Sequence, residues 1–384
     1  MTIQEMLERE DIYTILSQTL EDYFHTVWGK DVLVRVEKSL LRNTYVIYPR
    51  LGVVVSRFPS WKVAKDIYTQ FNVQSNWKRK LFAWGYITLC FLTFGMLASR
   101  SLFISDKKWC RRNRYIMPCN RKIRVFDYGG GYVDAILKVG FNDTYFKNEL
   151  KYRVNPKYEF IPPFIQYGDR WYREALLTGR ALVRLNESQY DTAVKKTKEE
   201  IGKLYSDTKH YESINAYCQR LENHIKDKLP LLKGQKGISI EYVQVVLNKI
   251  SEYIKGIDIQ VPLVTSHGDL QTGNIMVNEA GVVTIYDWET AGERSIWFDM
   301  GKLLLYSQRK GRYAYMIENR DDKSVKDALL AFDDKQYPMT HIISILVLEE
   351  IAFFVDEICD LPGAMGTEIM DRLTDELKLT TLFG

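Results

Sequence analysis

The segment from Ser266 to Glu289 constrains the fold of this 384-residue chain more than any other. It contains two short apolar, β-branched runs, residues 275–277 and 282–286, separated by the turn-forming sequence NEAG. Runs of this kind on either side of a short turn predict an antiparallel hairpin. Pairing Val277 with Val282 would close the hairpin and bring the residues that flank it to the same end.

Three polar side chains flank the expected hairpin. Asn274 precedes its first strand, Asp287 follows its second strand, and Asp269 lies five residues before Asn274 on the entering loop. Two oxygen-bearing side chains suit Mg²⁺, a hard cation that prefers a few protein oxygens and otherwise binds water and phosphates. The third side chain can orient a hydroxyl. Phosphoryl transfer requires such a constellation, because that reaction depends mainly on positioning and on neutralising charge.

The region upstream is expected to form two hairpins with a helix between them. The first hairpin turns at Gly129-Gly130-Gly131, a run that suits a backbone conformation which only glycine adopts cheaply. The expected strands lie at residues 123–128, 132–139, 160–167 and 171–177, and the helix lies at residues 143–153. Residues 188–255 and 342–355 favour further helices.

The loop pattern H-G-D-x-x-x-x-N, followed by a strand that leads into an aspartate, occurs here as His267–Asn274 and Ile285–Asp287. It resembles the aminoglycoside phosphotransferase and choline kinase family, which is related to the protein kinases. Tyr286 separates the isoleucine from the aspartate, a departure from the family pattern. The resemblance covers about residues 123–310, roughly half of the chain. It implies an α+β, two-lobed, protein-kinase-like fold with a small antiparallel-sheet N-lobe, a mainly helical C-lobe, and ATP and Mg²⁺ as cofactors.

The same resemblance implies roles for the downstream residues. Asp269 would be the catalytic base that accepts or orients the proton of the substrate hydroxyl, a role worth ~10²–10⁴ in rate. Asn274 and Asp287 would hold the metal. His267 would pack and hydrogen-bond the loop, and Asp299 would brace it, although an N-cap role at a helix would equally suit Asp299.

The upstream half would bind the nucleotide. Lys138, on the strand after the glycine run, would reach the ATP phosphates, and Glu149, on the following helix, would pair with it. The shortened phosphate loop would comprise Gly129, Gly130 and Gly131. The stretch Leu176–Leu182 resembles the family segment that links the two lobes and meets the adenine.

An N-terminal α/β appendage, residues 1–120, is expected ahead of an N-lobe at 121–180 and a helical C-lobe at 181–384. Within the appendage, residues 81–99 carry no charge and would span about 28 Å as a helix, near the thickness of a bilayer core. Basic residues stand at both ends of this run, so they give it no orientation in a membrane. The run could span a membrane, lie on its surface, or pack inside the protein.

Charge is distributed unevenly along the chain. The net charge of +4 is too small to indicate a nucleic-acid partner. Residues 78–124 contain twelve Lys or Arg and one acid, hence +11, which leaves −7 for the remainder. Such a segment could bind an anionic membrane surface, or simply be solvated around a packed helix. Five cysteines without paired spacing, and an N-terminus without a signal pattern, predict a cytoplasmic enzyme, free or at the inner face of the membrane.

The favoured function is therefore an ATP-dependent kinase that phosphorylates a hydroxyl of a small molecule, with a sugar or a polysaccharide or glycolipid precursor preferred. Aminoglycosides, choline and other amino alcohols are alternative substrates, for whose charge Glu289 and Asp356 are candidate partners. A catalytically silent kinase-like binding module is the alternative from another class. A silent module is disfavoured because every residue expected in the catalytic site is present. A protein kinase is disfavoured because the glycine loop is short and no A-P-E sequence follows Asp287 soon.

Overall fold

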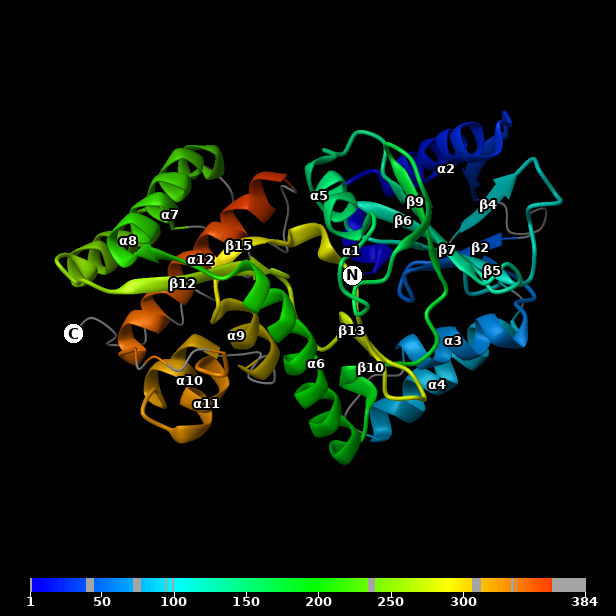
Figure 1. The fold of residues 1–384 in the computed structure, drawn as a ribbon. Helices are drawn as coiled ribbons and strands as arrows, with labels where there is room; N and C mark the ends of the chain where they lie inside the picture. The colour runs from blue at the N-terminus through cyan, green and yellow to red at the C-terminus, as the bar shows by residue number, and fades with distance from the viewer. Residues whose placement is uncertain are drawn as a thin grey trace. The chain divides into compact units, whose positions relative to one another are not determined.

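The computed structural model describes residues 2–38, 45–71, 77–93, 95–98, 100–233, 239–305, 312–332, 335 and 337–360 (Figure 1). The chain divides into two compact units. The first comprises Met1–Asn155 and Pro162–Thr178, and the second comprises Pro156–Ile161 and Gly179–Gly384. The expected α+β class is confirmed, because the first unit is built on an antiparallel sheet and the second is rich in helices.

The described part of the first unit contains a nine-stranded antiparallel sheet with the strand order β1-β4-β2-β3-β5-β6-β7-β9-β8. The strands are β1 (Val34–Glu37), β2 (Tyr45–Tyr48), β3 (Val53–Ser56), β4 (Arg100–Ile104), β5 (Arg114–Pro118), β6 (Lys122–Asp127), β7 (Tyr132–Leu137), β8 (Phe164–Tyr167) and β9 (Trp171–Ala175). The helices are α1 (Ile3–Leu7), α2 (Ile12–Trp28), α3 (Trp61–Phe71), α4 (Trp77–Leu92) and α5 (Thr144–Arg153). The two expected hairpins and the helix between them are thus β6–β7, β8–β9 and α5.

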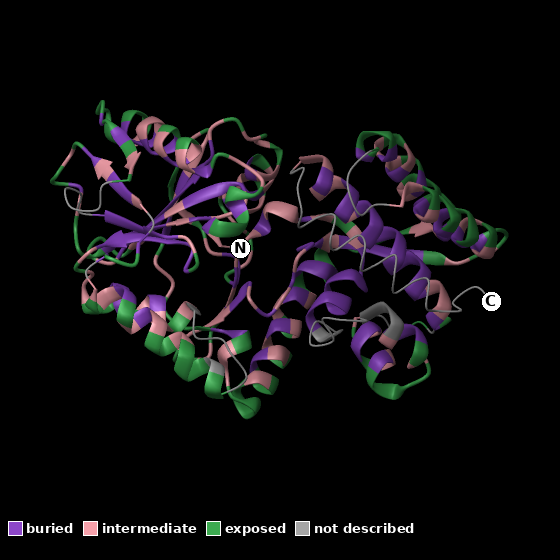
Figure 2. Ribbon diagram, turned by 180° about the vertical axis from the view of Figure 1, so that it is seen from behind, coloured by how far each residue is buried: buried purple, intermediate pink, exposed green. Residues whose placement is uncertain are grey.

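Both faces of this sheet are covered by apolar side chains. Strand side chains alternate between faces, so Tyr45 and Ile47 of β2 join the cluster formed with α1 and α2, whereas Val46 and Tyr48 join the cluster formed with α3 and α4. Helix α2 begins where the Asp11 carboxylate accepts a hydrogen bond from the Thr14 amide, a typical N-cap. The sheet is therefore the middle layer between two helical layers (Figure 2).

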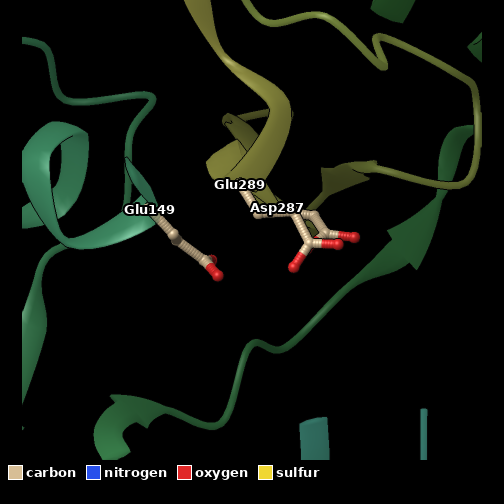
Figure 3. A group of neighbouring side chains, drawn as sticks. All are labelled: Glu149, Asp287 and Glu289. Carbon is tan, nitrogen blue, oxygen red and sulfur yellow. The ribbon is translucent and has the colours of Figure 1, made fainter. Parts of the chain in front are cut away.

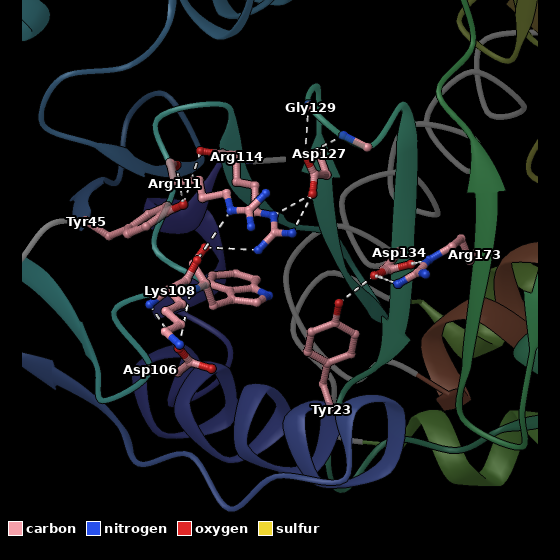
Figure 4. Close-up of polar contacts among 12 residues, drawn as sticks. Tyr23, Tyr45, Asp106, Lys108, Arg111, Arg114, Asp127, Gly129, Asp134 and Arg173 are labelled. Carbon is pink, nitrogen blue, oxygen red and sulfur yellow. Dashed lines mark hydrogen bonds and ion pairs between the residues drawn. The ribbon is translucent and has the colours of Figure 1, made fainter.

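The expected boundary at residue 120 is wrong. Strands β1–β5 belong to the same sheet as β6–β9, so residues 1–120 are not a separate appendage, and the sheet is larger than the small N-lobe that was expected. A polar contact also links the residues before 120 to the later strands of the sheet. Tyr23 of α2 donates a hydrogen bond to Asp134 of β7, and Asp134 also pairs with Arg173 of β9 (Figure 4). The expected boundary near residue 180 agrees with the change of unit after Thr178.

The second unit consists mainly of helices: α6 (Glu187–Thr208), α7 (Ile214–Lys228), α8 (Ile240–Ile254), α9 (Phe298–Leu305), α10 (Arg312–Glu318), α11 (Lys323–Leu329) and α12 (Met339–Asp360). Its short 3₁₀ helices are η1 (Leu182–Arg184), η2 (Leu229–Leu232) and η3 (Trp288–Thr290). The described strands are β10 (Arg180–Ala181), β11 (His210–Ser213), β12 (Gln260–Ser266), β13 (Ile275–Val277), β14 (Val283–Ile285) and β15 (Gly292–Ser295). They form two small sheets, β10-β13-β14 and β11-β12-β15, which carry the loop and the hairpin singled out in the sequence.

The charge-free run at 81–99 does not form one helix. Helix α4 begins earlier, at Trp77, and ends at Leu92, and a turn follows in which Gly95 adopts a positive φ of 90°. Across the described part of the chain, no helix has both the length and the apolar character needed to cross a membrane.

Candidate active site

The loop from His267 to Gly273 leaves strand β12 and is fixed by a buried carboxylate. Asp299, in the first turn of α9, accepts hydrogen bonds from the backbone amides of His267 (2.7 Å) and Gly268 (3.0 Å) and from the hydroxyl of Tyr205 (2.8 Å). Asp299 therefore braces the loop, and the alternative of a helix N-cap is excluded because α9 begins before it, at Phe298.

The loop requires glycine at position 268. Gly268 has a φ of +83°, and a Cβ there would lie 2.3 Å from the carbonyl oxygen of Thr290. An L-residue would be disfavoured by both the backbone conformation and this contact.

His267 is a structural residue of the loop. Its Nδ1 accepts a hydrogen bond from the Asp269 amide at 3.2 Å, so its Nε2 is the atom that donates to the carbonyl of Tyr286 at 3.0 Å. The buried ring also packs edge-on against Trp288, with ring centroids 4.7 Å apart. The imidazole thus ties the loop to the strand that carries Asp287.

Asp269 lies half-buried at the centre of the loop. Its Oδ2 accepts hydrogen bonds from the side-chain amides of Gln271 (2.8 Å) and Asn274 (3.0 Å). Burial raises the pKa of the carboxyl; the charge of Lys302 opposes this rise, and the nearby Asp287 reinforces it. A carboxylate with a raised pKa and a fixed orientation is suited to accept a proton from a hydroxyl.

The expected hairpin is present, but its register differs by one residue. Val277 pairs with Val283 rather than with Val282. Asn274 and Asp287 still lie at the same end of the hairpin, as expected. The amide of Tyr286 donates to the carbonyl of Asn274 at 3.1 Å, which places Asp287 next to the start of the hairpin.

Asp287 and Glu289 form the acidic part of the site (Figure 3). Asp287 has a left-handed backbone conformation with a φ of +70°, unusual for a residue with a side chain and typical of functional sites. One carboxylate oxygen of Asp287 lies within 4.8 Å of one of Glu289. The side-chain nitrogen of Asn274 donates to the backbone and side-chain oxygens of Asp269, so its Oδ1 is the atom that can face a cation. The oxygen donors of these residues fit a hard divalent metal.

The expected pairing of Lys138 with Glu149 is wrong. The buried ammonium of Lys138 contacts the Glu10 carboxylate at 2.6 Å and the Asn120 carbonyl at 3.0 Å. Burial lowers the pKa of Lys138, although the hydrogen bond to Glu10 opposes this effect. Lys138 thus holds the N-terminal segment to the sheet.

Glu149 of α5 pairs instead with Lys122 of β6, a residue that the sequence motifs did not indicate. The Lys122 ammonium lies 2.6 Å from the Glu149 carboxylate, which also accepts hydrogen bonds from Arg153 (2.8 Å) and from the Tyr172 hydroxyl (3.0 Å). All four side chains are buried. The first unit therefore contains a buried lysine–glutamate pair between strand and helix, with a different lysine from the one expected.

The glycine turn between β6 and β7 does not have the geometry expected of a phosphate loop. The amides of Gly129 and Gly130 both donate to the Asp127 side chain at 2.9 Å, and the Gly131 amide donates to the Asp127 backbone oxygen at 2.8 Å. Arg114 pairs with the same carboxylate at 2.6 Å (Figure 4). The amides that would bind a phosphate are thus already bonded to Asp127.

The linking stretch and Asp356 were also expected to belong to the functional site. The linking stretch Leu176–Leu182 contains the change of unit, and Gly179 is required there because a Cβ would lie 2.5 Å from the Val277 carbonyl oxygen. Asp356 of α12 pairs with His224 (2.8 Å) and Lys228 (2.5 Å) of α7 and is not part of the loop or hairpin.

A braced loop with a half-buried aspartate lies beside a hairpin with oxygen donors. Phosphoryl transfer requires positioned and charge-neutralising groups of this kind. Residues 170–332 match the model of the phosphotransferase enzyme family. The matched segment is less than half of the chain. The match agrees with the expected resemblance and supports a phosphotransferase.

Several solved structures are similar to the chain at low sequence identity. An ethanolamine kinase of Plasmodium vivax is 13% identical, with a TM-score of 0.48 over 84% of this chain and 94% of that chain. A choline/ethanolamine kinase family protein of Mesorhizobium loti is 14% identical, with a TM-score of 0.46 over 70% and 89%. An aminoglycoside phosphotransferase solved with streptomycin and ATP is 13% identical, with a TM-score of 0.45 over 69% and 90%. No curated protein sequence matches the chain.

Proposed function

We propose that this protein transfers the terminal phosphoryl group of ATP to a hydroxyl of a small molecule. The observation that carries the proposal is the loop on which Asp269 is held by Gln271 and Asn274 and braced through the backbone by Asp299. A phosphotransferase needs a positioned carboxylate beside a charge-neutralising site, and both features lie on this loop and the hairpin that follows it.

Asp269 is proposed as the catalytic base. The substrate hydroxyl would donate a hydrogen bond to the Asp269 carboxylate and transfer its proton as its oxygen bonds to the terminal phosphorus, while ADP leaves. The amide donors on Oδ2 fix the orientation of the carboxylate, so that little reorganisation is needed in the reaction.

Asn274 and Asp287 are proposed to hold Mg²⁺, and the position of Glu289 supports adding it to this set. Their donor atoms are the oxygens that Mg²⁺ prefers, and the Asp287 and Glu289 carboxylates are close enough to share one ion. When bound, Mg²⁺ would offset the negative charge of the phosphates.

In the first unit, we assign the phosphate-binding ammonium to Lys122 rather than to Lys138. Lys122 is paired with Glu149, which is itself held by Arg153 and Tyr172, so its ammonium has a fixed position. Lys138 and the turn Gly129–Gly131 have their donors bonded to other groups of the first unit.

The preferred substrate is a sugar, either free or within a polysaccharide or glycolipid precursor. The preference is supported by the apolar and basic segment at residues 78–124, which would suit an enzyme that meets substrates near a membrane. Amino alcohols and aminoglycosides are the alternative substrates that the family offers.

ATP consumption across a panel of sugars, amino alcohols and aminoglycosides tests the proposal. At least one compound should stimulate turnover in the presence of Mg²⁺. The Asp269→Asn variant should lower kcat by about 10²–10⁴ and still bind nucleotide, because the change keeps the shape of the side chain. The Asp287→Asn variant should require more Mg²⁺ for half-maximal turnover.

Asp258→Asn is the matched control, since Asp258 is an exposed aspartate of the same unit ahead of β12. It should leave turnover unchanged. Full activity of Asp269→Asn would contradict the assignment of the base. Nucleotide binding without turnover on any compound would favour a silent binding module.

A further inference from the structure

Helix α4 exposes large apolar side chains along most of its length. Phe82 is 78% exposed, Trp77 67% and Leu92 66%, and Met96 in the following turn is 79% exposed. Many residues of α3 and α4 are exposed (Figure 2). The apolar ones on α4 and near the start of α3 define a surface that we call the α3–α4 face. Its apolar members are Phe58, Trp61, Trp77, Leu81, Phe82, Trp84, Leu89, Leu92, Met96 and Leu97.

The inner side of α4 is already fully packed. Ile87 and Cys90 are buried in the cluster between α3, α4 and the sheet. Tyr68 of α3 hydrogen-bonds the hydroxyl of Thr88 and packs against Trp84, with ring centroids 6.3 Å apart. Because these contacts fix the orientation of the helix, the exposed side chains belong to an outer face and not to the core. Exposed apolar side chains that gather on one side of a helix are typical of interaction sites.

The segment that forms the α3–α4 face is rich in basic residues. Residues 57–105 contain seven Lys or Arg and a single acid, Asp66. Asp66 points inward, where its carboxylate accepts hydrogen bonds from the Tyr115 hydroxyl (2.7 Å) and from Gln70 (2.7 Å). Lys62, Lys65 and Lys80 are exposed. The one negative charge of the segment is therefore turned into the unit, while these positive charges face outward.

We propose that the α3–α4 face binds the surface of a bilayer that contains anionic lipids. Exposed tryptophans are suited to the boundary between headgroups and acyl chains, since their rings are apolar and their N–H groups polar. The lysines would meet the lipid phosphates. Helix α4 would lie in the plane of the surface, because its 16 residues reach only about 24 Å.

Charge complementarity favours a bilayer over a second copy of the chain. A twofold contact through this face would bring two sets of lysines together without carboxylates to pair with them. An anionic bilayer supplies the opposite charge and an apolar layer at once. The proposal does not depend on the proposed kinase function, because the α3–α4 face contains none of its site residues.

Co-sedimentation of the full chain with vesicles tests the proposal. Vesicles of phosphatidylcholine and phosphatidylglycerol should retain the protein at low salt, whereas pure phosphatidylcholine vesicles should retain much less. The double variant Lys62→Gln, Lys80→Gln should weaken binding about 30-fold, since each lysine contributes about five-fold near an anionic surface. The double variant Phe82→Ser, Leu92→Ser should weaken it by about tenfold or more.

Two control variants carry the same changes elsewhere. Lys249→Gln with Lys255→Gln, and Ile165→Ser with Leu231→Ser, alter exposed residues outside the α3–α4 face and should bind like the parent chain. The proposal is overturned if the parent chain ignores anionic vesicles, or if the controls weaken binding as much as the face variants. A dimer that Phe82→Ser, Leu92→Ser dissociates, without vesicle binding, would show that a second copy occupies the face.

Discussion

Two buried lysines of the first unit, Lys122 and Lys138, differ in what their ammonium groups do. Lys122 pairs with Leu137 across the β6–β7 ladder, so the side chains of Lys122 and Leu137 share one face of the sheet. Lys138 follows Leu137 directly, and its side chain therefore points to the opposite face. The face of Leu137 is the one that packs against Phe146 of α5, the helix that carries Glu149. The pairing of β6 with β7 thus determines which lysine lies next to Glu149. The sequence of a single strand does not reveal this pairing.

Substitution of these two lysines should separate function from stability. Lys122→Met should lower turnover about 100-fold or more, as expected when one charge-stabilising donor is removed, while the fold is kept because Arg153 and Tyr172 still bind Glu149. Lys138→Met should leave Glu10 without its main partner and cost roughly 3 kcal/mol of unfolding free energy. Steady-state kinetics and thermal unfolding of both variants provide the measurement.

At temperatures below its lowered melting temperature, the Lys138→Met variant should show normal turnover per folded molecule. If turnover fell with Lys138→Met and not with Lys122→Met, Lys138 would be the phosphate-binding residue after all.

Among the elements, helix α12 is held to strand β15 by a buried carboxyl group. Glu349 accepts hydrogen bonds from the hydroxyl of Tyr217 on α7 and from the amide and hydroxyl of Ser295 on β15. Burial raises the pKa of Glu349 to about 7, despite these donors. Three elements of the second unit therefore meet at a group that titrates near neutrality.

The stability of the second unit should depend on pH through Glu349. Its pKa in the folded chain exceeds its ordinary value of 4.5, so the folded chain binds more protons than the unfolded chain between about pH 4.5 and 7. The contribution of Glu349 to the unfolding free energy should fall by about 3 kcal/mol across this window as pH rises. Glu349→Gln keeps the shape of the protonated form and should remove this slope in urea unfolding at several pH values. An unchanged slope would show that other groups cause the pH dependence.

The elements around the loop were largely predictable from the sequence because they depend on local signals. The hairpin and the loop brace follow from short strands and a fixed spacing of polar residues. The register was wrong by one residue because Asn278 closes the turn, with its side chain accepting a hydrogen bond from the Val282 amide at 2.9 Å. That bond occupies Val282, and the ladder begins at Val283. The pattern of apolar residues does not reveal that a side chain will bind a backbone amide in place of the opposite strand.

At the scale of the whole molecule, the extent of the first unit was not predictable. The pairings β1–β4, β4–β2 and β3–β5 join strands that are far apart in sequence, and no local pattern encodes them. The family resemblance begins at β6 and therefore suggested a boundary where the sheet in fact continues.

A chain of residues 121–384 should consequently fail to fold as a soluble monomer. It lacks β5, so β6 becomes an unprotected edge strand, and it lacks α1 and α2, which cover Ile123 and Val125. Expression followed by sedimentation and far-UV circular dichroism checks this outcome. A folded, monomeric 121–384 chain would show that β6–β9 and the second unit do not need β1–β5 in order to fold.

The strand order also has a consequence for protein synthesis. Strands β5, β6 and β7 are consecutive both in the chain and in the sheet, with β1–β4 already complete by residue 104. On the ribosome, β6 and β7 would each find the preceding strand already made, so only short loops need to close at these two steps. Translation would lay down most of the sheet strand by strand before the residues of the catalytic loop had been made.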